Sequence, residues 1–180
     1  MQAAAPAQVE VRHLPPRYDV ALSVRIDAPP AQVYATFADI TLLPQINPSV
    51  REAKLLQRGE RTQRVSTRVR LCVAFFCRDL RQVQDMRLGF KDDRGEIHAE
   101  VLPALSDMRF GSAHWQFEAC GQHQTCLQFR SVMEPDFWVP PMIGPWMIQR
   151  VLEHEARVTS EGFARLARTR TPTSSSMDEH

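Results

Sequence analysis

The stretch IDAPPAQVYATFADITLLPQINP, residues 26–48, separates one alternating segment from a long series of β-forming segments. An acidic residue, Asp27, and two prolines lie near its start, and three apolar residues then recur at helical spacing: Val33, Tyr34 and Phe37. A second short helix is predicted from Leu42 to Ile46, because a residue that precedes proline, here Asn47, disfavours helical backbone. The stretch therefore predicts two short helices in succession.

Strands are predicted on both sides of these helices. Residues 18–26, YDVALSVRI, alternate between apolar and polar side chains. Six further strands are predicted at 50–56, 64–72, 77–88, 96–102, 108–119 and 125–133. Consecutive strands that are joined by turns form an antiparallel meander, and their charged residues mostly oppose their apolar ones. The sequence thus predicts a curved antiparallel sheet of seven strands with one solvated face, in an α+β fold.

A long helix is predicted after Pro145. Its apolar stripe consists of Ile148, Val151, Leu152, Val158, Thr159, Phe163 and Leu166. Gly162 lies on or beside this stripe and has two interpretations. It is either a tolerated residue that weakens the helix slightly, or a missing side chain where the helix crosses a cavity.

Length and composition indicate a single domain. The 180 residues are 43% hydrophobic and 24% charged, with a net charge of +1. This charge argues against a nucleic-acid partner, and no apolar run reaches the roughly 20 residues that span a bilayer. We expect a flexible Ala/Pro-rich arm at 1–17, one ligand-binding domain at 18–168 and a disordered tail at 169–180.

The order of these elements resembles the helix-grip fold of the SRPBCC superfamily, which includes START-like, pollen-allergen-like and polyketide cyclase proteins. The resemblance runs from about Tyr18 to Ala167 and is carried by residues 26–48 and by LEHEARVTSEGFARLA, residues 152–167. Within the superfamily the chain looks closest to bacterial cyclase/dehydrase-like or coenzyme Q-binding START-like proteins. The resemblance implies a sheet that grips the long helix around an apolar cavity, which members use for lipids, sterols, polyketides, quinones or hormones.

On this basis we expect a non-enzymatic carrier or sensor of a hydrophobic small molecule that needs no cofactor. The expected cavity lining is Val69, Leu71, Trp115, Phe117, Leu127, Phe129, Met133, Ile148, Leu152 and Phe163. One alternative is an aromatase or cyclase that folds a polyketide chain. Another is a partner-binding protein that uses an apolar rim. The sequence leaves the oligomeric state open.

The four cysteines form two close pairs, Cys72 with Cys77 and Cys120 with Cys126, and each pair brackets a predicted hairpin turn. Facing hairpin residues have Cβ atoms roughly 4.5–5.5 Å apart, near the distance that a disulfide requires. Two disulfides are therefore predicted. The alternatives are free thiols, a zinc site, or a nucleophilic cysteine assisted by His123.

The N-terminal segment MQAAAPAQ has no signal-peptide features, but it looks like the small-residue segment that follows a cleavage site. Together with the predicted disulfides, it favours export to the periplasm. The alternative is an ordinary flexible N-terminus of a cytoplasmic protein.

Two aromatic segments are expected at the cavity mouth. In related folds the loop that joins the third and fourth strands acts as a gate, and here that loop is Val73–Phe76. The segment FWVPPMIGPWM, residues 137–147, enters the long helix at the same end. The predicted rim comprises Phe75, Phe76, Phe137, Trp138 and Trp146. It would form a membrane-facing lip, or Phe75 and Phe76 would instead fold inward and plug the cavity.

Acid–base candidates near the predicted cavity are His98, Glu100, Asp107, His114 and Glu155. Strand parity places the two histidines and Glu100 on the solvent face, and Asp107 suits a turn. The alternative for His114 is a β-bulge after Gly111, which would reverse its orientation. Glu155 follows the helix stripe and is expected to point toward the sheet. No nucleophile–base set, metal-ligand spacing or Gly-rich phosphate loop is found, so catalysis is the less favoured interpretation.

Overall fold

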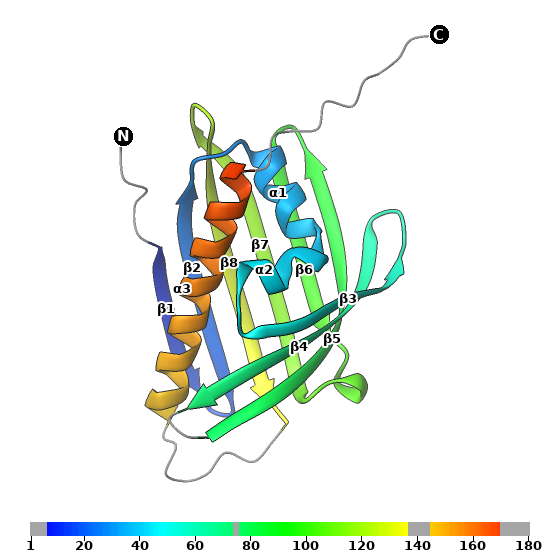
Figure 1. The fold of residues 1–180 in the computed structure, drawn as a ribbon, viewed down its shortest axis with the longest axis vertical. Helices are drawn as coiled ribbons and strands as arrows, with labels where there is room; N and C mark the ends of the chain where they lie inside the picture. The colour runs from blue at the N-terminus through cyan, green and yellow to red at the C-terminus, as the bar shows by residue number, and fades with distance from the viewer. Residues whose placement is uncertain (1–6, 74–75, 137–144, 170–180) are drawn as a thin grey trace.

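The computed structural model of the chain describes residues 7–73, 76–136 and 145–169. One antiparallel sheet of eight strands, in the order β1-β2-β8-β7-β6-β5-β4-β3, curves around the C-terminal helix α3 (Figure 1). The strands are β1 (Gln8–Leu14), β2 (Arg17–Ile26), β3 (Val50–Arg58), β4 (Thr62–Val73), β5 (Phe76–Lys91), β6 (Arg94–Val101), β7 (Met108–Gly121) and β8 (Gln124–Pro135). The seven predicted strands are confirmed as β2 to β8.

The prediction of seven strands in total is wrong, because β1 adds an eighth within the segment expected to be a flexible arm. Val9 and Val11 alternate with charged residues, and Val11 is buried in register with Val20 of β2. The side-chain amide of Gln149 on α3 donates to the Val11 carbonyl. The alternation in QVEVRHL was thus a usable strand signal. Residues 170–180 of the expected tail lie outside the described residues.

The helices cover the concave face of the sheet (Figure 1). They are α1 (Pro30–Ala38), η1 (Ile40–Leu42), α2 (Leu43–Ile46) and α3 (Pro145–Thr169), and a further 3-10 turn, η2 (Pro103–Leu105), precedes β7. Helix α1 starts at a proline, whose missing N–H costs nothing in a first helical turn. The two short helices and the long helix were predicted, whereas the two 3-10 turns were not.

The core lies between the sheet and the helices and is joined by aromatic contacts. Phe117 on β7 is fully buried, and the rings of Tyr34 and Phe37 on α1 meet it edge-on. Phe37 also stacks on Phe163 of α3, with ring centroids 3.4 Å apart. Such ring pairs contribute about 0.5–1.5 kcal/mol beyond the area that they bury. Helix α1 is therefore fixed to the sheet and to α3 through the same side chain.

Gly162 is the point at which α3 crosses the backbone of α2. A Cβ atom at this position would lie 2.1 Å from the carbonyl oxygen of Ile46 and 2.8 Å from its carbonyl carbon. The missing side chain therefore faces α2 rather than the cavity, because only glycine lets the two backbones approach this closely.

We expect Gly162→Ala to lower the free energy of unfolding by about 1–3 kcal/mol, because the new methyl group would push against backbone. Urea denaturation would measure the change, and Glu161→Ala, at the exposed neighbouring position, should change it by no more than about 0.5 kcal/mol. A gain of about 1 kcal/mol, as expected for Gly→Ala in an unhindered helix, would show that the two helices are not in close contact.

Both predicted disulfides are formed. Cys72–Cys77 joins the end of β4 to the start of β5, and Cys120–Cys126 closes the turn between β7 and β8. All four cysteines are paired, so the alternatives of free thiols, a zinc site and a nucleophilic cysteine are wrong for this structure. Within the described ranges, no helix combines the length and apolar character needed to cross a bilayer.

Candidate functional site

A cavity of about 250 Å³ lies between the concave face of the sheet and helices α1 to α3. Most of the side chains around it are apolar. Its lining consists of Val20, Leu22, Phe37, Ile40, Leu43, Gln84, Met86, Ile97, Trp115, Phe129, Met133, Leu152, Glu155, Ala156, Thr159, Ser160 and Phe163. A concave apolar site with a few polar groups is typical of small-molecule binding.

The structure brings half of the expected lining to this cavity. The five residues that line it are Trp115, Phe129, Met133, Leu152 and Phe163. Phe117 and Leu127 are instead fully buried in the core, where α1 covers β7 and β8. Val69, Leu71 and Ile148 are half-buried and do not line the cavity. These three lie nearer the end of the molecule where β4 ends and α3 begins (Figure 1).

Several lining residues were missed, although some carried a readable signal. Val20 and Leu22 alternate on the inner face of β2, next to β8 in the sheet. Phe37, Ile40 and Leu43 come from α1, η1 and α2, whose position over the sheet is not encoded in local periodicity. Strand alternation could have identified the first group, while the second depends on how the short helices pack.

The cavity has a polar corner, where Glu155 of α3 meets the segment after α2. The Asn47 side-chain amide donates to Glu155 Oε2 at 2.8 Å, and the Ser49 hydroxyl donates to Oε1 at 2.9 Å. The same Asn47 nitrogen lies 2.8 Å from the Thr159 hydroxyl, which accepts a second hydrogen bond. From its place beside the helix stripe, Glu155 is expected to point toward the sheet. The structure places it in the cavity wall with two partners from another segment.

The remaining acid–base candidates lie away from the cavity. His98, Glu100 and His114 are on the outer face of the sheet, as strand parity predicted. Asp107 accepts a hydrogen bond of 2.7 Å from the Arg81 backbone N–H, which explains it structurally. Among the described residues that line the cavity, Glu155 is the only titratable one.

The His114 ring has a perturbed protonation equilibrium on that outer face. Burial lowers the pKa of His114 below its ordinary value of 6.5, and the neighbouring His98 lowers this pKa further. The carboxylate of Glu96 acts in the opposite direction, but burial has the larger effect. The neutral form of the imidazole is thus favoured.

Only part of the expected rim falls in the described residues: Phe75, Phe137 and Trp138 lie outside them. Trp146, in the first turn of α3, is 60% exposed, and Phe76, at the start of β5, is 37% exposed. The beginning of α3 and the end of the β4–β5 hairpin lie at the same end of the molecule (Figure 1). Phe76 is not among the described residues that line the cavity.

Comparison with solved structures finds the same fold at low sequence identity. A STAR-related lipid transfer protein from Xanthomonas axonopodis has a TM-score of 0.75 at 14% identity, covering 94% of this chain and 97% of that one. The Zhui aromatase/cyclase from a Streptomyces species has a TM-score of 0.70 at 17% identity, covering 84% and 94%. Human StAR-related lipid transfer protein 5 has a TM-score of 0.71 at 9% identity, covering 93% and 85%.

Comparison with the curated proteins found no match. The family model described as polyketide cyclase/dehydrase and lipid transport matches residues 26–156, which is more than half of the chain. The matched region contains the two short helices, the six strands from β3 to β8, and Glu155. The chain therefore belongs to the polyketide cyclase/dehydrase and lipid transport family.

Proposed function

We propose that the protein binds and carries a hydrophobic small molecule in the cavity between the sheet and α3. The observation that carries this proposal is an apolar cavity with a single carboxylate, Glu155, in its wall. Apolar walls favour an apolar ligand, because each Å² of apolar surface removed from water contributes about 25 cal/mol. The family and its fold support a hydrophobic ligand in general terms.

The polar corner narrows the class of ligand that we propose. A carboxylate offers about four lone-pair positions, and Asn47 and Ser49 occupy one on each oxygen of Glu155. The remaining positions can accept a hydrogen bond from a ligand, but they cannot donate one. The proposed ligand therefore has an apolar body and a hydroxyl group that donates to Glu155, as in a sterol-like or phenolic polyketide-like molecule.

Filling the cavity should abolish binding without unfolding the protein. We expect Ala156→Phe to weaken binding of the fluorescent apolar probe 8-anilinonaphthalene-1-sulfonate at least tenfold, because Ala156 lines the cavity. Fluorescence titration would measure the dissociation constant. The matched control is Ala31→Phe on the exposed face of α1, which should bind the probe as the unchanged protein does. Equal binding by both variants would place the probe elsewhere and contradict the proposal.

An aromatase or cyclase activity is the second candidate function, and the position of Glu155 favours it specifically. A positioned carboxylate in an apolar cavity can accept or donate a proton during ring closure. Incubation with a polyketide-like substrate and mass spectrometry of the extract would separate the two functions. A carrier returns its ligand unchanged, whereas an enzyme yields a product whose formation is lost in Glu155→Gln.

We further propose that the end of the molecule bearing Phe76 and Trp146 docks on a membrane surface. Both side chains are exposed, and each would contribute about 1.5–3 kcal/mol if it were fully buried in lipid. The net charge of +1 offers little attraction to anionic lipid, so these aromatic side chains would supply most of the docking energy.

The double variant Phe76→Ser, Trp146→Ser should lose binding to phosphatidylcholine vesicles in a flotation assay, while its free energy of unfolding falls by about 1 kcal/mol or less. Leu56→Ser, which removes an exposed apolar side chain from the β3–β4 hairpin, should leave flotation unchanged. Unchanged flotation of the double variant would contradict membrane docking at this end.

We also propose that the protein works in an oxidising compartment such as the periplasm. The two disulfides support this location, because such bonds persist outside the reducing cytosol. Protein isolated from its native host under alkylating conditions should carry no alkylated cysteine. Four alkylated cysteines in that material would instead place the protein in the cytoplasm.

A further inference from the structure

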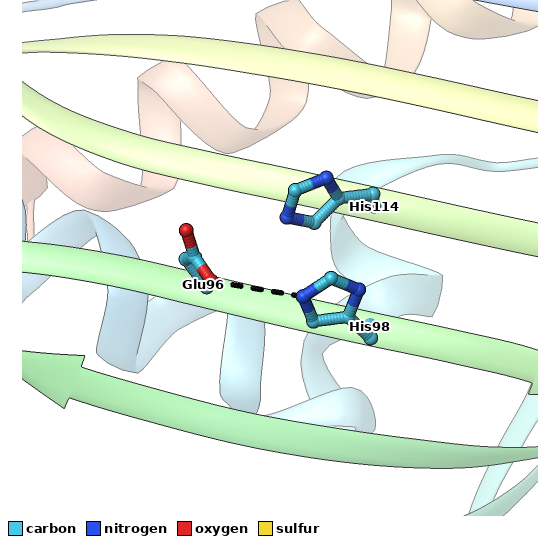
Figure 2. A group of neighbouring side chains, drawn as sticks. All are labelled: Glu96, His98 and His114. Carbon is cyan, nitrogen blue, oxygen red and sulfur yellow. Dashed lines mark ion pairs between the residues drawn. The ribbon is translucent and has the colours of Figure 1, made fainter.

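The outer face of the sheet, opposite the ligand cavity, carries a compact group of three side chains. Glu96 and His98 alternate with buried residues on β6 and so project to the outside. His114 on β7 is the cross-strand partner of His98 in the sheet register. Figure 2 shows the three side chains converging, with one nitrogen of each imidazole ring turned toward the Glu96 carboxylate.

The three side chains are close enough to share one ion. One ligand atom from each lies within 4.8 Å of the other two, and His98 Nε2 is 3.7 Å from Glu96 Oε2. The two rings are stacked with centroids 4.0 Å apart and an interplanar angle of 15°. Ligands about 2.0 Å from a tetrahedral zinc ion are about 3.3 Å apart, so small side-chain rotations would complete the geometry.

His114 gives an independent indication of a missing partner. Its Nε2 atom is buried and has no hydrogen-bond partner among the described residues. In Figure 2 this is the ring nitrogen that is directed toward Glu96 and His98. Buried polar atoms are normally paired, and an exception calls for an explanation such as a bound ion. A metal ion within the cluster would give this nitrogen its partner.

We propose that Glu96, His98 and His114 bind a divalent transition-metal ion, such as Zn²⁺, on the outer face of the sheet. Two imidazoles and one carboxylate are a ligand set that suits zinc, and solvent can supply a fourth ligand. Access for that solvent ligand exists, because the side chains of Glu96 and His98 are 57% and 44% exposed. This site is independent of the cavity and of the proposed ligand.

Neighbouring charges restrict which metal ions can bind. Arg87 is the partner of His98 on β5, and Arg130 is the partner of His114 on β8. Arg87 is partly neutralised by an ion pair of 3.2 Å with Glu100. The positive charges of these two arginines, which lie beside the histidines in the sheet, oppose the binding of ions that are held mainly by charge, such as Mg²⁺ and Ca²⁺. They oppose less strongly an ion that gains its affinity from imidazole nitrogen.

Isothermal titration calorimetry with ZnCl₂ tests the proposal on tag-free full-length protein that has been treated with a chelator and then freed of it. We expect one equivalent of Zn²⁺ to bind and no heat of binding with MgCl₂. His98→Gln and His114→Gln should each weaken zinc binding at least tenfold. The matched control is His154→Gln, at an exposed position of α3 outside the cluster, which should retain the affinity of the unchanged protein.

A loss of zinc binding through unfolding must be distinguished from a loss through removal of a metal-ligating side chain. The distinction is clearer at His98, because His114 is half-buried whereas His98 is more accessible. Thermal unfolding in the presence of a chelator should be the same for His98→Gln as for the unchanged protein. If zinc binds with equal affinity and stoichiometry to His98→Gln, or if the unchanged protein binds no zinc at millimolar concentration, the proposal is overturned.

Discussion

The close approach of α3 to the backbone of α2 at Gly162 is the constraint on which the rest of the structure depends. With only a hydrogen atom between Gly162 and the Ile46 carbonyl, α3 lies directly on the end of α2. The next residue of that segment, Asn47, is then within hydrogen-bonding distance of both Glu155 and Thr159. One backbone contact therefore fixes the spacing between the helices, and this spacing places a carboxylate in the wall of an otherwise apolar cavity.

The same arrangement explains how the domain keeps an internal space. Phe37 joins α1 to α3 by ring stacking and to β7 through Phe117, so the core is densely packed around the short helices. Trp115 and Phe129 lie across from α3 on neighbouring strands and line the cavity instead of filling it. The cavity lies between the concave face of the sheet and α3, and Thr159, Ser160 and Phe163 line it beside the Gly162 contact.

The two faces of the sheet carry different chemistry because strand side chains alternate. On β6, Ile97 faces the cavity, while Glu96 and His98 face outward. The apolar interior supports the proposed ligand, and the outer cluster supports the proposed metal ion. Since the two sites share strands but lie on opposite faces, either proposal can stand without the other.

The sequence by itself determined strands β2 to β8, the two short helices, the long helix and both disulfide pairs, because alternation, helical spacing and hairpin position are local signals. It also placed His98 and His114 on the solvent face by parity. It missed β1, since the Ala/Pro-rich start outweighed the alternation around Val11.

Tertiary structure alone decided which residues reach the cavity and which hydrogen-bonding or metal-ligating side chains come together. Half of the expected lining lies elsewhere, because strand parity gives the face of a residue but not its distance from α3. Glu155 acquires its partners from residues more than 100 positions away, and His98 meets His114 only through strand register. Local patterns cannot encode such contacts, because they depend on how far the sheet curves and where the helices cross it.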